Sequence, residues 1–147
     1  MLQIAQIINT ILFLVISGLH FYWAFGSMFG KKIKGATSVL PEVNGKSAFI
    51  PSTFSTFVVA FGLLLFAEVS SFGLVKYFDF QMFSPIIPFG NLAISIIFMM
   101  RAMGDFRLVG FFKKIKSTQF AENDSKFYSP LCVLISVLAF VIYWNLK

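Results

Sequence analysis

Four long apolar stretches alternate with three more polar connections along this chain of 147 residues. A helix needs about 20 predominantly apolar residues to cross the hydrocarbon core of a bilayer. The pattern predicts membrane-spanning helices over about 4–25, 54–75, 88–103 and 130–146. Pro51, Pro88 and Pro130 stand near the starts of the last three, where a missing N–H removes no helical hydrogen bond.

The composition supports a membrane protein. The chain is 58% hydrophobic and 12% charged, with a mean hydropathy of +0.84. A soluble fold of about 150 residues buries only about 70% of the surface that it exposes when unfolded, so lipid must cover the remainder. Runs such as 58–66 and 91–100 lack the alternation of barrel strands. We therefore predict an all-α fold, a single domain over 1–147 that forms a bundle of four transmembrane helices.

Positive charge predicts the orientation of this bundle. Ten of the twelve Lys and Arg residues lie in the first and third connections. Positive loops stay on the cytoplasmic side of a membrane. Both termini and the second connection should therefore face outward, in a multi-pass protein of the inner (cytoplasmic) membrane. The ten cations are Lys31, Lys32, Lys34, Lys46, Arg101, Arg107, Lys113, Lys114, Lys116 and Lys126.

The same charges argue against a nucleic-acid partner. The net charge is +6, but the cations stand beside membrane spans, where topology and anionic headgroups account for them. In the third connection, residues 105–116 mix Phe, Leu, Val and Ile with Lys and Arg, which predicts a short amphipathic interfacial segment after the third helix. One cysteine, Cys132, and one histidine cannot form a typical zinc shell, so we expect no metal and no cofactor.

Polar side chains within the first span are candidates for function, since such residues are costly in lipid. Ser17, His20 and Trp23 recur at steps of three, which places them on one face of a helix. A neutral imidazole at His20 could accept a proton, contact a ligand or donate a hydrogen bond. The alternative is a histidine that packs between helices, with Trp23 as an aromatic anchor at the interface.

A charged group follows at the cytoplasmic end of the third helix. Arg101 and Asp105 are four residues apart and would pair if the helix continued, with Arg107 close by. A carboxylate between two guanidinium groups stays ionised. This favours a structural ion pair or an anion-binding pair of arginines. Glu122 and Asp124 could reach the same rim, or they could cap the fourth helix or be solvated.

Two polar residues lie toward the outer side. Glu68 falls about fourteen residues into the second helix, and an intramembrane carboxylate is a functional candidate. Asn91, early in the third helix, should lie at a similar depth. We expect Asn91 to be the cross-helix partner of Glu68.

Several of these residues belong to motifs that resemble a known family. The chain is similar to small bacterial four-helix membrane proteins catalogued as a domain of unknown function. The resemblance implies the fold and the candidate positions, and no reaction. It rests on residues 17–26 (SGLHFYWAFG), 101–107 (RAMGDFR), 110–113 (GFFK), 120–124 (FAEND) and 128–131 (YSPL).

Four functional hypotheses remain open at this point. The first is a cytoplasm-facing polar pocket for a small or lipid-derived anionic ligand. The second is an enzyme acting on a lipid-soluble substrate, with His20 transferring a proton. The third is an oligomeric transporter or channel, which the apolar middle of every span disfavours. The fourth is a structural or accessory subunit of the membrane; a homo-oligomer is compatible with each. The proposed pocket is lined by His20, Trp23, Arg101, Asp105 and Arg107.

Overall fold

The computed structural model describes residues 1–30, 39–43, 46–72, 74 and 85–147. The all-α prediction is confirmed, apart from two strands of two residues each. Aromatic residues of the predicted outer connection, such as Tyr77, lie outside the described residues. The helices are α1 (Leu2–Met28), α3 (Thr53–Ser71), α4 (Ile87–Met103), α5 (Gln119–Asn123), the π-helix η2 (Asp124–Tyr128) and α6 (Ser129–Leu146).

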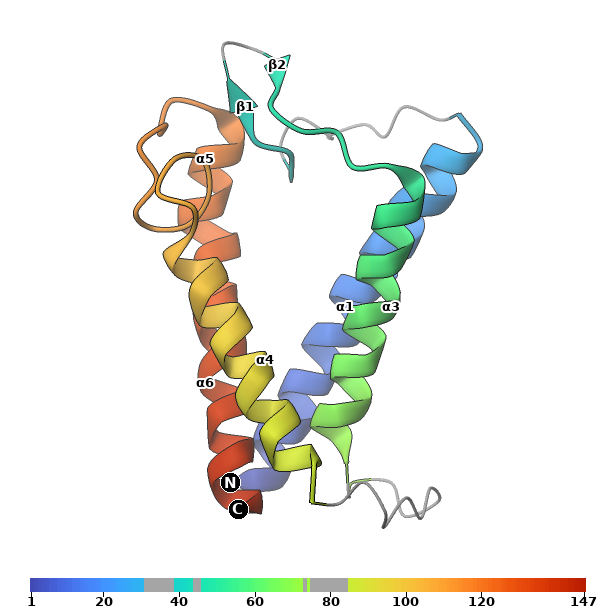
Figure 1. Cartoon of the computed structure of the whole chain (residues 1–147), viewed down its shortest axis with the longest axis vertical. Coiled ribbons are helices and arrows are strands. Elements are labelled where there is room, and N and C mark those ends of the chain that lie inside the picture. Colours follow the sequence, from blue (N-terminus) through green and yellow to red (C-terminus); the bar gives the residue numbers. More distant parts are fainter. Residues whose placement is uncertain (31–38, 44–45, 73, 75–84) are drawn as a thin grey trace.

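The helices form two antiparallel pairs that meet at one end and diverge toward the other (Figure 1). One pair is α1 with α3, and the other is α4 with α6. Both chain termini lie at the narrow end, whereas the third connection and the described parts of the first connection lie at the wide end. A hairpin of β1 (Glu42–Val43) and β2 (Lys46–Ser47) also lies at the wide end. The described parts of the two connections are thus on the same side of the molecule, while Lys31, Lys32 and Lys34 lie outside the described residues.

Among the described residues, three helical segments are long and apolar enough to cross a membrane: α1, α3 and the continuous helix Gln119–Leu146. Helix α4 is equally apolar in character but spans only 17 residues. Large apolar side chains such as Leu65 and Ile97 are exposed on the outer faces of these helices. In water this exposure would be unfavourable, whereas lipid solvates it. The chain is therefore a membrane-embedded protein.

The last helix, α6, begins at Ser129, close to the predicted start near 130, but α5 and η2 precede it without a break, so the continuous helical segment starts at Gln119. The Thr118 side chain caps the new start by accepting a hydrogen bond from the Ala121 N–H (3.1 Å). The helix then widens into the π-turn of η2 just before Pro130. A proline inside a helix removes one hydrogen bond and crowds the preceding turn. A π-turn relieves that crowding, so Pro130 lies within a helix that it does not end.

An apolar core joins the two helix pairs. Phe13 is fully buried, and its ring lies 5.6 Å from the ring of Phe66 and 5.4 Å from the ring of Phe98, both in edge-on contact. Edge-to-face pairs of this kind add to the stabilisation from burial. This core lies between the wide end and the narrow end. Its buried members are Phe13, Leu63, Ala67, Ile94, Ile135 and Ala139.

Between this core and the narrow end, amide side chains satisfy the carbonyl groups at the end of α3. Gln6 Nε2 donates to the Phe72 carbonyl (2.8 Å), and Asn91 Nδ2 donates to the Val69 carbonyl (3.2 Å). Asn9 Nδ2 contacts the buried Ser70 hydroxyl (3.2 Å). Backbone groups in a bilayer must find such partners, because water does not reach them. The amides thereby hold α1 and α4 to α3.

Asn91→Ala should lower the free energy of unfolding by about 1–2 kcal/mol, because the Val69 carbonyl loses its donor in a dry environment. Unfolding in mixed micelles measures this change. Asn145→Ala is the control, since Asn145 is exposed and donates only to the Val141 carbonyl of its own helix. Equal effects of the two substitutions would contradict a role for Asn91 in joining helices.

Candidate functional site

The segment that follows α4 is a closed loop, here called the basic loop (residues 104–118). Helix α4 ends at Gly104, which has a φ of +88°, and Gly110 has a φ of +87°. Their backbones touch: a Cβ on Gly104 would overlap the Val109 carbonyl oxygen, and a Cβ on Gly110 would overlap that of Met103. The Phe111 N–H donates to the Ala102 carbonyl (2.9 Å) and closes the turn. Glycine is required at both positions because of this close approach.

Asp105 stabilises the start of this loop. Its Oδ1 accepts hydrogen bonds from the backbone N–H groups of Arg107, Leu108 and Val109 at 2.9, 2.7 and 2.9 Å. Desolvation raises the pKa of Asp105, but these backbone donors outweigh it and leave the pKa below its ordinary value. The expected pairing of Asp105 with Arg101 was wrong, because α4 ends at Met103 and Asp105 lies outside the helix.

The partner of Arg101 is Asp124, whose side chain is fully buried. Asp124 Oδ1 lies 3.1 Å from Arg101 Nη2, and Oδ2 lies 3.0 Å from Lys113 Nζ. The Gly110 N–H also donates to Asp124 Oδ2 (2.7 Å). We call Arg101, Lys113 and Asp124 the ion cluster. It joins the end of α4, the basic loop and η2 at one point, so Asp124 neither caps a helix nor faces solvent.

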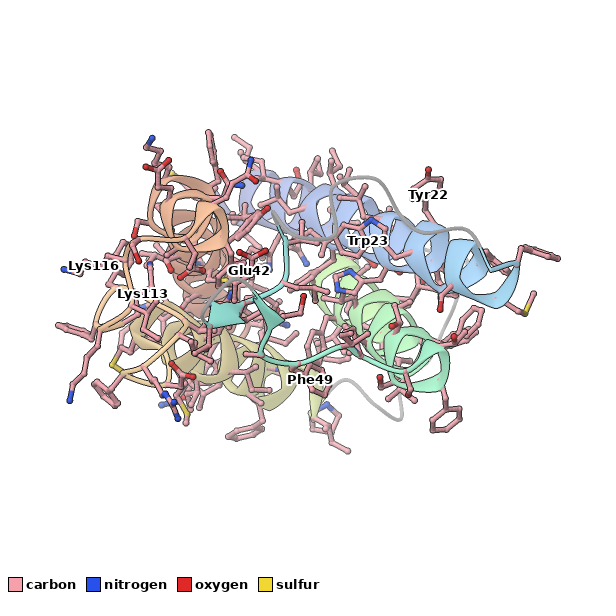
Figure 2. The ribbon with its side chains drawn as sticks, turned by 90° about the horizontal axis from the view of Figure 1, so that it is seen from above. Tyr22, Trp23, Glu42, Phe49, Lys113 and Lys116 are labelled. Atoms are coloured by element: carbon pink, nitrogen blue, oxygen red, sulfur yellow. The ribbon has the colours of Figure 1, made fainter. Side chains whose placement is uncertain are left out.

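Lys113 is fully committed within this cluster. Besides Asp124, its ammonium group donates to the Gly110 carbonyl (3.0 Å) and to the Ser125 hydroxyl (2.7 Å). Its side chain is 1% exposed. In Figure 2, Lys113 is directed into the loop, whereas Lys116 extends away from the protein. A buried ammonium group with three acceptors is a structural cation.

Arg101 is only partly committed. Its side chain is 36% exposed and bonds Asp124 through Nη2, while Nη1 is buried and has no partner in the described part of the chain. The buried Ser129 hydroxyl is also unpartnered there. Ser129 lies one π-turn from Asp124, since its N–H donates to the Asp124 carbonyl. Buried polar groups are nearly always satisfied, so two orphans beside one ion cluster require an explanation.

His20 and Trp23 lie on α1, in the other helix pair, with their rings 5.1 Å apart. His20 Nδ1 is 2.8 Å from the Ile16 carbonyl oxygen. A carbonyl only accepts, so Nδ1 carries a proton in this contact, and in a neutral imidazole the lone pair is then on Nε2. Figure 2 shows Trp23 on the inner side of α1 and Tyr22 on the outer side. Within the described residues, no hydrogen bond or ring contact joins either candidate to the ion cluster.

The remaining candidates are dispersed. Arg107 is exposed, and its guanidinium group has no partner among the described residues. Glu68 is exposed on α3 and is not the partner of Asn91, which donates instead to the carbonyls of Val69 and Ile87. The described part of the chain contains no cluster of His, Cys, Asp and Glu that could hold a metal ion.

Sequence reasoning named Asp124 as a residue that could reach the rim beside Arg101, which is correct, but it missed the pairing with Lys113 and the roles of Gln6 and Asn9. Asp124 and Lys113 form their ion pair across eleven residues of a loop, a separation that no helical or strand period signals. Gln6 and Asn9, by contrast, precede Phe13 and Ser17 at steps of three and four. That spacing marks one helix face, and extending the polar face of α1 toward its start would have found both residues.

Comparison with protein families matches residues 13–139 to one described as protein of unknown function (DUF3995). The chain belongs to this family. The DUF3995 match includes most of α1, the basic loop and the ion cluster, and it confirms the resemblance seen in the motifs. Comparisons with curated proteins and with solved structures found no match. For this DUF3995 protein, function must therefore be argued from its own residues.

Proposed function

We propose that this protein crosses the inner membrane four times, with both termini outside, and binds an anionic group at its cytoplasmic end. The basic third connection and the described parts of the first connection lie at the wide end, opposite the termini, as expected of a positive-inside protein. Helix α4 is short for a span, and Gly104 ends it where the charged groups begin. These observations support the topology.

The unpartnered Nη1 of Arg101 is the observation that carries the binding proposal. The ion cluster contains two cations and one carboxylate, so it holds one excess positive charge. The ammonium group of Lys113 already donates to Asp124, Gly110 and Ser125, and the excess positive charge therefore lies on Arg101. A guanidinium group with a free donor edge binds carboxylate or phosphate oxygens, commonly through two hydrogen bonds.

Ser129 favours the same chemistry. Its hydroxyl is buried and has no partner within the described residues, and its backbone N–H donates to the Asp124 carbonyl. An oxyanion accepts from both groups at once, whereas a cation or an apolar ligand would leave them unsatisfied. Asp105 was among the ligand contacts expected from the sequence. It is left out of this proposal, because its Oδ1 accepts hydrogen bonds from three backbone N–H groups. The oxyanion is the phosphate of a lipid headgroup or a small soluble anion.

Thermal unfolding of the purified protein in a zwitterionic detergent tests the site. Inorganic phosphate and phosphatidylglycerol are the two probes, and a neutral lipid is the reference. A rise in Tm with phosphate indicates a soluble anion, and a rise only with phosphatidylglycerol indicates a headgroup. Ser129→Ala should reduce the rise while leaving the ion cluster intact.

Lys126→Gln is the matched control, since it removes an exposed cation that lies outside the basic loop and should preserve the response. Arg101→Lys keeps one charge for Asp124 but removes the second donor edge, so it should lose the response. If neither probe shifts Tm, or if Ser129→Ala and Arg101→Lys respond as the parent protein does, the anion site is wrong.

Proton transfer by His20 is the second candidate function, and the tautomer of the His20 imidazole favours this function. The Ile16 carbonyl holds a proton on Nδ1, so in a neutral imidazole the lone pair of Nε2 is the one that would face a substrate. A transport path is less well supported, since the aromatic core of Phe13, Phe66 and Phe98 lies between His20 and the polar residues near the termini. His20→Gln should abolish an activity that depends on this lone pair.

A further inference from the structure

The basic loop exposes apolar and cationic side chains together. Phe106, Phe111 and Phe112 are 60%, 46% and 63% exposed, and the rings of Phe106 and Phe112 lie 6.2 Å apart. None of these three rings is part of the ion cluster or of the buried apolar core. Exposed cations accompany them on the same short segment: Arg107, Lys114 and Lys116.

The exposure is built into the backbone of the loop. Phe106 has a φ of +60°, a conformation that side chains other than glycine rarely adopt. Asp105 holds the following three N–H groups, and Gly104 contacts the Val109–Gly110 backbone. Such strain persists only where surrounding contacts over-determine it. The loop therefore presents Phe106 outward in a defined conformation.

We propose that the basic loop is a docking surface for anionic lipid headgroups. Its place at the end of α4 puts it where a spanning helix leaves the hydrocarbon. Phenyl rings enter the boundary between headgroups and acyl chains, and cations remain among the phosphates. Lys113 takes no part, because Asp124 neutralises it.

Charge complementarity selects the occupant. The loop carries three exposed cations and one exposed carboxylate, that of Asp105. The Oδ1 of Asp105 accepts hydrogen bonds from the backbone of the loop itself. A zwitterionic surface offers the phenyl rings the same apolar boundary but offers the cations no net attraction. Each cation near an anionic membrane should raise local enrichment by about fivefold. The inference rests on membrane embedding and is independent of the site at Arg101.

Tryptophan fluorescence in vesicles tests the surface. Phe112→Trp is placed in a chain whose own tryptophans are removed by Trp23→Phe and Trp144→Phe. Two vesicle types contain equal parts of phosphatidylcholine and phosphatidylglycerol, with bromine on the chains of one lipid or the other. Brominated phosphatidylglycerol should quench the fluorescence more strongly. Lys114→Gln with Lys116→Gln should equalise the two lipids, as should high salt.

Phe127→Trp in the same background is the positional control. Phe127 is 64% exposed on η2, outside the basic loop, and should be quenched equally by both lipids. Lys126→Gln is the charge control and should leave the preference at position 112 unchanged. Equal quenching of Phe112→Trp by both lipids would overturn the selection of anionic headgroups. Quenching by neither lipid, with access to aqueous acrylamide, would overturn docking itself and favour a soluble acidic partner.

Discussion

Asp124→Ala is expected to lower the free energy of unfolding by about 3–5 kcal/mol, the cost of removing one partner from a buried ion pair. Lys113 is 1% exposed and would lose its carboxylate partner, while Arg101 would lose its only side-chain partner in the described chain. The Gly110 N–H would also become unsatisfied. Unfolding in mixed micelles, followed by circular dichroism, measures the loss.

Glu122→Gln is the control for this prediction. Glu122 lies in the same segment and pairs with Lys126 at 3.8 Å, but both side chains are 66% exposed. Exposed pairs contribute little, so the substitution should be nearly silent. Asp124→Leu combined with Lys113→Met removes both buried charges and should recover part of the loss. A silent Asp124→Ala would show that the ion cluster does not hold the loop to the helices.

The helices could be predicted because each apolar run is one continuous local signal. The burial of Asp124 could not, because its partners come from two other segments, the end of α4 and the basic loop. Spacing on a helix suggested Asp105 as the partner of Arg101, and that choice failed when Gly104 ended the helix. A glycine between two charged residues was the available sign of an interruption.

The candidate site was predicted only in part. His20, Trp23 and Arg101 all lie in the halves of their helices nearest the wide end, as their positions along the spans implied. Their separation into two helix pairs depends on which helices pack together, since α1 contacts α3 more closely than α4. Hydrophobic pattern cannot specify that choice when every face is apolar. Helix pairing in lipid depends on small and polar contacts such as Ser17 with the Ala60 carbonyl (2.8 Å).

Gly104→Ala and Gly110→Ala are each expected to lower the free energy of unfolding by about 2–6 kcal/mol, the sum of backbone strain and steric overlap. Both glycines have positive φ. A Cβ at Gly104 would overlap the Val109 carbonyl oxygen, and a Cβ at Gly110 would overlap the Met103 carbonyl oxygen. Neither oxygen belongs to a flexible side chain that could move aside. The loop must therefore open, which would separate Asp124 from the Gly110 N–H.

Gly18→Ala and Gly62→Ala provide the matched comparison. Both glycines lie inside helices, and a Cβ at either position would meet open space. Alanine favours a helix over glycine by about 1 kcal/mol, so these variants should be as stable as the parent or slightly more stable. Loop opening also predicts a specific link. The Gly110→Ala loss should shrink in a background of Asp124→Leu with Lys113→Met, because the contact that it breaks is already absent. Additive losses would mean that the glycine turn and the ion cluster stabilise the protein independently.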